Sequence, residues 1–110
     1  MKRYKPLFEA EKTAFENIAP NIFKRDPKDI KKYKLRLGFF IEHYNKKVYI
    51  DLFEEERGLS HEYTISIGLN ENPLKNKTID NVYASLADAM DEVKRYISEI
   101  LKGKMSRYLI

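Results

Sequence analysis

Three consecutive segments between residues 33 and 69 alternate apolar with polar side chains at a period of two. Successive side chains of an extended strand point to opposite faces, so this period is typical of strands that bury one face. The apolar positions, in chain order, are Leu35, Leu37, Phe39, Ile41, Val48, Ile50, Leu52, Tyr63, Ile65, Ile67 and Leu69. The pattern therefore predicts a three-stranded antiparallel meander with one apolar face.

Two turns set the register of this meander. Asn45-Lys46 suits a two-residue turn because asparagine tolerates positive φ, and Gly58-Leu59 suits the second turn. The first turn predicts Phe39 opposite Leu52, and the second predicts Leu52 opposite Ile65. A slip of one residue would move the apolar side chains of a strand to the polar face, so the two registers support each other.

The stretch from Ser85 to Lys102 has the spacing of an amphipathic helix. Its apolar residues lie on one stripe of a 3.6-residue period: Leu86, Met90, Val93, Ile97, Ile100 and Leu101. Ser85 suits the N-cap, and Gly103 follows where a left-handed C-cap residue is common. Because such a stripe needs an apolar surface to cover it, we expect this helix to lie on the apolar face of the meander.

The remaining segments complete an expected α+β fold. A proline and the apolar spacing after it predict a first helix over residues 6–19. Ile22 and Phe23 follow in a connector, and we expect both to pack against the core. Three apolar residues before the last helix suggest a short fourth strand: Ile79, Val82 and Tyr83. We expect one α+β domain over residues 1–110.

Length and composition limit the classes of protein to which this chain can belong. A chain of 110 residues is typical of one domain, and we expect flexible tails at 1–5 and 104–110. The chain contains no cysteine, which excludes disulfides and thiolate metal sites. Its N-terminus lacks the apolar run of a signal peptide, and no segment approaches the length of a membrane span. We therefore expect a cytoplasmic protein that does not engage a membrane.

The ionisable residues do not converge on a catalytic centre. The predicted registers place His43 opposite Val48 and His61 opposite Glu56, about 26 Å apart at about 3.3 Å per residue. Two predicted carboxylate pairs lack a third ligand or a proton-transfer partner: Glu55 opposite Glu62, and Glu42 diagonal to Asp51. We expect no enzymatic activity, no cofactor and no bound metal.

Basic residues are concentrated in one part of the chain. The net charge is +4, and residues 24–36 include seven basic side chains against two acidic ones. Together with lysines at the first predicted turn they form a candidate phosphate-binding surface, called here the basic strip: Lys28, Lys31, Lys32, Lys34, Arg36, Lys46 and Lys47. The alternative is that these residues belong to a solvated connector and bind nothing.

The opposite face of the meander, called here the aromatic face, carries Phe40, Tyr49 and Phe53. The predicted registers place Gly38 opposite Phe53 and Gly68 opposite Tyr49, so that each ring would cover bare glycine backbone. Three alternatives remain for this face. The first helix covers it, or it binds a protein partner, or it stacks single-stranded bases flanked by lysines.

Two functions from different classes follow from these surfaces. The leading hypothesis is a small non-enzymatic binding protein that engages a nucleic acid or a nucleoprotein through the basic strip. The alternative is a protein-directed inhibitor or regulator of the kind that phages and mobile elements encode, for example an inhibitor of a host defence nuclease complex. Its protein interface would be either the aromatic face or an acidic run, with these candidate residues: Phe40, Tyr49, Phe53, Glu54, Glu55 and Glu56. A homodimer through the aromatic face is also left open.

Overall fold

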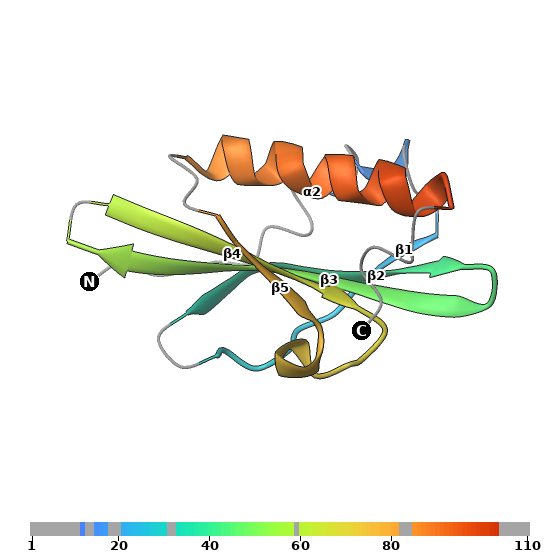
Figure 1. The fold of residues 1–110 in the computed structure, drawn as a ribbon, viewed down its shortest axis with the longest axis horizontal. Helices are drawn as coiled ribbons and strands as arrows, with labels where there is room; N and C mark the ends of the chain where they lie inside the picture. The colour runs from blue at the N-terminus through green and yellow to red at the C-terminus, as the bar shows by residue number, and fades with distance from the viewer. Residues whose placement is uncertain are drawn as a thin grey trace.

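Five antiparallel strands form one sheet in chain order, and the helix α2 crosses one of its faces (Figure 1). The computed structural model describes residues 12, 15–17, 21–30, 33–58, 60–81 and 85–103, without the side chains of residues 57 and 79–81. The elements are β1 (Ile22–Lys24), β2 (Lys34–His43), β3 (Lys46–Arg57), β4 (Ser60–Gly68), the 3-10 helix η1 (Pro73–Lys75), β5 (Lys77–Asn81) and α2 (Leu86–Leu101). The fold is α+β, and its described sheet has two strands more than the predicted meander.

The helix α2 confirms the strongest helical signal of the sequence. At its start the Ser85 Oγ accepts a hydrogen bond from the backbone N–H of Asp88 at 3.2 Å, and Gly103 takes a positive φ of 85° past its end. Its buried residues pack on the apolar face of the sheet: Ala89, Met90, Val93, Tyr96, Ile97 and Ile100. In the described part of the chain, no helix is long and apolar enough to cross a membrane.

The hairpin of β3 and β4 follows the predicted register. Leu52 pairs with Ile65 and Ile50 pairs with Ile67, and all four side chains belong to the apolar core. Gly58 in the turn has a φ of 56°, a left-handed conformation that glycine adopts without a Cβ clash. The apolar pattern and the turn residue therefore agreed on this pairing.

The hairpin of β2 and β3 turns one residue earlier than predicted. Tyr44 and Asn45 form its two-residue turn with φ values of 49° and 63°, as in a type I′ turn. Phe39 consequently pairs with Ile50 instead of Leu52. The two registers differ by two residues, and such a shift keeps the same side chains on the apolar face. The hydrophobic pattern therefore cannot distinguish them.

A β-bulge at Arg36 changes the face of the residues before it. Leu35 pairs with Phe53 and Leu37 pairs with Leu52, which leaves Arg36 as an extra residue in β2. Leu35 consequently lies with Phe53 on the aromatic face, whereas the period-two pattern predicted it on the apolar face. The bulge adds one residue, and one residue is enough to reverse the alternation.

The strands β1 and β5 extend the sheet beyond the predicted meander. β1 lies in a segment predicted as a connector, where the buried Ile22 pairs with Ile41. β5 pairs with β4 and begins at Lys77, two residues before the short fourth strand suggested at Ile79. The other two residues of that suggested strand lie outside the described residues: Val82 and Tyr83.

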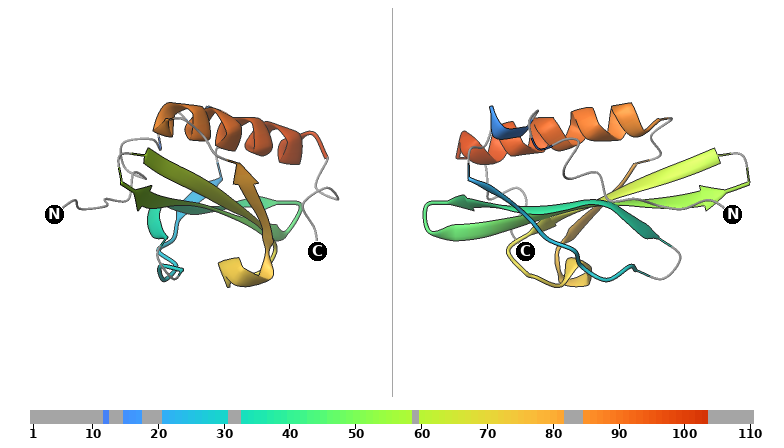
Figure 2. Two further views of the ribbon diagram at one scale, coloured as in Figure 1. Left: turned by 60° about the vertical axis from the view of Figure 1, so that its left-hand side comes forward. Right: turned by 180° about the vertical axis from the view of Figure 1, so that it is seen from behind.

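The predicted first helix, over residues 6–19, lies mostly outside the described residues, although Lys12 and Phe15 are helical. The Phe15 side chain is fully buried, and its ring centre lies 5.5 Å from that of Phe39. This part of the segment packs beside α2 on the apolar face (Figure 2), which contradicts the alternative that the first helix covers the aromatic face. Two further predictions concern residues outside the described ranges: the flexible tails at 1–5 and 104–110.

Two connectors lie over the aromatic face, on the side of the sheet opposite α2 (Figures 1 and 2). The first, residues 25–30, runs along β2, and the Asp29 Oδ1 accepts a hydrogen bond from the Leu35 N–H at 3.0 Å. The second, residues 70–76, includes η1 and lies against β4, where the Ser66 Oγ donates to the Pro73 carbonyl at 2.9 Å. These connectors decide which parts of the aromatic face remain accessible.

Candidate functional site

The fold neutralises part of the basic strip. Lys34 Nζ lies 3.5 Å from Asp29 Oδ2, and Arg36 Nε lies 3.4 Å from Glu54 Oε1. Glu54 is buried, and a buried carboxylate needs a cation or hydrogen-bond donors beside it. These two members of the strip are therefore engaged within the molecule.

The other members of the basic strip lie in separate places. Lys46 and Lys47 are exposed at the β2–β3 hairpin, whereas Lys34 lies at the far end of β2. The ten residues of β2 separate these two ends by about 30 Å, at about 3.3 Å per residue. Lys28 is exposed on the first connector. Two members lie outside the described residues: Lys31 and Lys32. The described members of the strip therefore do not form one continuous surface.

The residues of the predicted protein interface also differ in exposure, and most of them are buried. Glu56 is exposed and Phe40 is half-buried, while the other members are buried: Tyr49, Phe53, Glu54 and Glu55. Phe53 contributes to a cavity of about 200 Å³ beside the connectors, lined by Ile30, Tyr33, Phe53, Thr64, Ser66, Leu74 and Thr78. The aromatic face therefore does not present its three predicted rings together.

The glycines of the aromatic face make room for the connectors. Gly68 lies opposite an aromatic residue of β3 as predicted, but a Cβ at this position would lie 2.4 Å from Asn76 Oδ1. Gly38 lies opposite Asp51 instead of Phe53, because the β2–β3 turn comes one residue earlier than predicted. A Cβ at Gly38 would lie 2.5 Å from the backbone oxygen of Arg25. Close approach of the connectors, and not ring packing, requires these two glycines.

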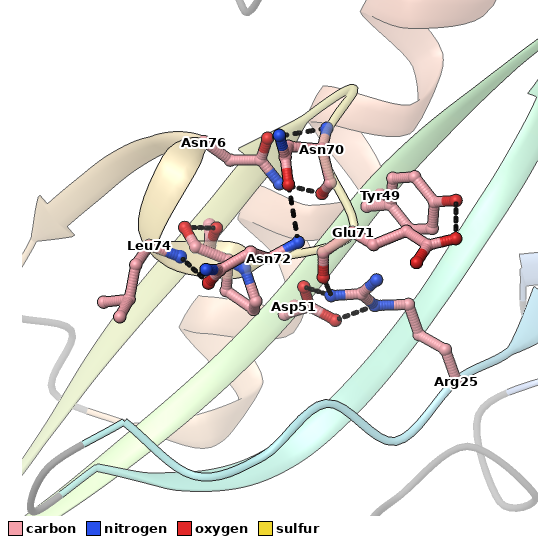
Figure 3. Close-up of polar contacts among 10 residues, drawn as sticks. Arg25, Tyr49, Asp51, Asn70, Glu71, Asn72, Leu74 and Asn76 are labelled. Atoms are coloured by element: carbon pink, nitrogen blue, oxygen red, sulfur yellow. Dashed lines mark hydrogen bonds and ion pairs between the residues drawn. The ribbon is translucent and has the colours of Figure 1, made fainter.

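Asp51, in the middle of β3, is fully buried and fastens both connectors to the sheet (Figure 3). Two hydrogen bonds join it to Arg25, whose Nε donates to Oδ1 at 2.9 Å and whose Nη2 donates to Oδ2 at 2.8 Å. The same Nη2 donates to the backbone carbonyl of Glu71 at 2.7 Å. Arg25 belongs to the first connector and Glu71 to the second, so one guanidinium holds both in place.

The ionisation of Asp51 reflects its enclosure. Burial raises the pKa of Asp51 to about 6, although the hydrogen bonds and the positive charge of Arg25 oppose this effect. Burial also raises the pKa of Tyr49, and the nearby carboxylate of Glu71 adds to that increase. Because Asp51 is fully buried and bound at both oxygens by Arg25, we assign it a structural role.

The two histidines stay at opposite ends of the sheet. His61 pairs with Glu56 as predicted, whereas His43 pairs with Lys46 because the hairpin turn comes earlier. The Nδ1 of His61 also lies 2.5 Å from Glu54 Oε2. Neither histidine has the other within reach for shared metal binding or proton transfer.

One of the two predicted carboxylate pairs is formed, and the other is not. Glu55 and Glu62 face each other across β3 and β4 as predicted. The predicted diagonal pair of Glu42 and Asp51 is wrong, since Glu42 lies opposite Lys47 and Asp51 is bound by an arginine. Within the described ranges, no three histidine, aspartate or glutamate side chains are grouped so that they could hold a metal ion.

A row of three aromatic rings crosses the aromatic face near the β2–β3 hairpin. Phe23 stacks on Phe40 at 5.1 Å between ring centres and 21° between planes, and Phe40 lies 5.6 Å from Tyr49. Arg25 lies over the Tyr49 ring at 4.5 Å, and Lys47 Nζ lies 5.1 Å from the centre of the Phe40 ring. Phe23 keeps 44% of its surface exposed, contrary to the expectation that it packs in the core. Its position on the edge strand β1 explains the difference.

The β2–β3 hairpin reaches past the C-terminal end of α2 (Figure 1) and carries an exposed tyrosine at its tip. Tyr44 is 83% exposed, and its ring centre lies 4.3 Å from that of His43. A positive φ costs a residue with a Cβ about 1–2 kcal/mol, and glycine or asparagine is usual at this turn position. The tyrosine thus occupies a position that the turn alone does not favour.

Aromatic and basic side chains lie at this end of the molecule on both sides of the hairpin: Phe23, Phe40 and Lys47 are on the aromatic face, Lys46 is on the opposite face, and Tyr44 is at the tip beside His43. We call the group the hairpin site and define it by Phe23, Phe40, Tyr44, Lys46 and Lys47. By contrast, carboxylates gather at the opposite end, on the β3–β4 hairpin: Glu54, Glu55, Glu56 and Glu62. The charge distribution therefore makes the hairpin site the better candidate for an anionic partner.

Comparison with known proteins does not reveal a relative of this chain, since no protein-family model, curated protein or solved structure matches it. The function is therefore argued from the residues of the site.

Proposed function

We propose that the protein is a small non-enzymatic binding protein that engages a nucleic acid or a nucleoprotein through the hairpin site. The observation that carries this proposal is the combination of two lysines with exposed aromatic rings at one projecting end of the sheet. Lysines bind phosphates without sequence preference, and aromatic rings stack on bases. Along β2, four residue steps or about 13 Å separate Phe40 on the aromatic face from Tyr44 at the tip.

In this proposal the hairpin site, and not the basic strip, is the centre of binding. Lys34 and Arg36 each lie beside a carboxylate of the fold, so a phosphate would have to compete with that carboxylate. Lys46 and Lys47 retain their predicted role as phosphate contacts. For Lys28 on the connector the role remains a prediction, as it does for the two members outside the described residues: Lys31 and Lys32.

A protein-directed inhibitor or regulator is the second candidate, and it is supported by the same end of the molecule. Protein interfaces centre on aromatic side chains and have a polar rim. Phe23 stacked on Phe40, with Glu42 and Lys47 beside them, has this composition. We rank it second because two exposed lysines at the same end of the sheet as exposed rings match a polyanion more directly.

Fluorescence anisotropy of labelled oligonucleotides, in single-stranded and duplex form, tests the proposal at low and moderate salt. We expect binding that weakens as salt rises, because bound lysines release counterions from the phosphates. The double variant Lys46→Glu/Lys47→Glu should lose this binding at low salt. The matched control Lys75→Glu/Lys77→Glu makes the same change of charge at exposed positions outside both the hairpin site and the basic strip, and it should bind like the wild type.

Two results would contradict the proposal in different ways. If the wild type binds neither form of oligonucleotide at low salt, nucleic-acid binding is excluded and the protein partner becomes the first candidate. If both double variants lose the same affinity, net charge and not the hairpin site accounts for the binding.

A further inference from the structure

We infer that the hairpin site takes single-stranded nucleic acid, with unpaired bases stacked on Phe23 and Tyr44. This inference rests on the proposed function and names the form of nucleic acid that the site recognises. It depends on three features of the site: which rings are open, how many cations lie beside them, and the conformation of the tip residue.

The open rings of the site favour unpaired bases. Arg25 covers the Tyr49 ring and Lys47 lies over Phe40. Phe23, which stacks on Phe40, and Tyr44, which lies beside His43, present the more accessible ring surfaces. In a duplex each base is already stacked on its neighbours, and the grooves expose base edges rather than faces. A ring can therefore stack on a base only where the strand is unpaired.

The number of cations is too small for tight duplex binding. Sequence-independent binding to a duplex commonly uses about six to ten phosphate contacts, whereas the hairpin site offers Lys46 and Lys47. Glu42 lies opposite Lys47 and reduces the local positive charge further. Stacking of one base on an aromatic ring increases affinity by about 5- to 150-fold. Two such contacts can therefore supply what the few lysines do not, and they act only on a single strand.

The conformation of Tyr44 supports a role for its ring outside the fold. The residue takes a φ of 49° that a side chain with a Cβ rarely adopts, and 83% of its surface is exposed. Asparagine or glycine would satisfy the turn with less strain. Within the described residues the ring contacts His43, and most of its surface stays exposed, so a base partner would use that surface.

The span of the site indicates a short contact. Four residue steps separate Phe40, which stacks on Phe23, from Tyr44, or about 13 Å along β2. At about 3.4 Å for each stacked nucleotide this distance covers about four nucleotides. We therefore expect oligonucleotides much longer than this to gain little further affinity for one molecule of the protein.

Competition between a labelled 12-nucleotide single strand and the same sequence as a duplex tests the inference. We expect the wild type to bind the single strand at least tenfold more tightly. Tyr44→Asn and Phe23→Thr should each weaken single-strand binding by about 5- to 150-fold and leave duplex binding unchanged. Asparagine suits the positive φ at residue 44, so this variant removes the ring without straining the turn. Leu74→Asn, at an exposed apolar residue outside the site, is the matched control and should bind normally.

The outcomes separate this inference from the proposed function. Equal affinity for single strand and duplex, with both ring variants neutral, would overturn the inference and leave the proposed function standing. Absence of binding to both forms at low salt would overturn the proposed function, and the inference with it. Loss of single-strand binding in the Leu74→Asn control equal to that in Tyr44→Asn would also refute the assignment of the rings.

Discussion

Replacing Asp51 with asparagine tests whether burial or the ion pair with Arg25 dominates the energetics of the aromatic face. Burial raises the pKa of Asp51 to about 6, from an ordinary value of 3.8. A carboxyl group whose pKa is raised on folding stabilises the folded state when protonated. Its contribution is therefore fully present below pH 3.8 and is lost as pH rises through about 6. The difference between the two pKa values corresponds to about 3 kcal/mol, at about 1.36 kcal/mol per pH unit.

Urea unfolding of the wild type and Asp51→Asn, followed by far-UV circular dichroism between pH 4 and pH 7, measures this contribution. Other carboxyl groups titrate in both proteins, so the difference between their free energies of unfolding isolates Asp51. We expect the wild-type value minus the variant value to fall by about 2 kcal/mol from pH 4 to pH 7. Glu42→Gln, at an exposed carboxylate, is the control and should change this dependence by less than about 0.5 kcal/mol.

The sign of the slope decides between the two effects. A difference that grows as pH rises would mean that Arg25 stabilises the ionised carboxylate by more than burial destabilises it. The pKa of Asp51 would then lie below its ordinary value, and the reasoning from burial would be refuted.

Three further substitutions test the packing of the fold. Gly68→Ala should lower the free energy of unfolding by about 1–3 kcal/mol, because its Cβ would lie 2.4 Å from Asn76 Oδ1, and urea titration would detect this loss. Phe15→Ala should cost about 3–5 kcal/mol because the ring is fully buried against Phe39, and a cost below about 1 kcal/mol would contradict its place in the core. Tyr44→Asn should stabilise the protein by about 1 kcal/mol by relieving the positive φ, and a lower melting temperature would contradict the assigned turn strain.

The elements predicted correctly are those with local, repeated signals. The stripe of α2 repeats over four turns and has a serine and a glycine at its ends, so each part of the signal supports the others. The β3–β4 pairing combined an apolar match with Gly58, a residue suited to positive φ. Agreement between independent local signals identified both elements before their packing was known.

The errors arose where two arrangements satisfy the same pattern. Asn45 suits either position of a type I′ turn, and the alternative registers of β2 and β3 bury the same side chains. No residue type in the sequence marks the β-bulge at Arg36. The pattern therefore assigned the residue before the bulge to the wrong face of the sheet. The register of β2 and β3 and the position of the bulge depend on geometry across the sheet, and not on the sequence of either strand.

The fastening of the connectors depends on residues far apart in the chain. From the sequence alone, Asp51 has the position of a solvated residue in an alternating strand. Arg25 is one of several cations in a basic segment. Their pairing spans 26 positions and needs Gly38 to admit the connector backbone. One signal for this pairing was present in the sequence: Asp51 is the single acid between two aromatic residues on one face of β3. An acid on a covered face requires a cation beside it.

Arg25 also limits the size of the hairpin site. Its guanidinium closes the row of rings at Tyr49 while it binds Asp51, so the accessible rings lie on the side of the β2–β3 hairpin. Lys34 and Arg36 are likewise engaged with carboxylates of the fold. Three of the seven cations in residues 24–36 therefore pair with carboxylates of the fold. Lys47 lies over the Phe40 ring and Lys46 is exposed next to it in the chain, which is why we place binding at the hairpin and not along the basic segment.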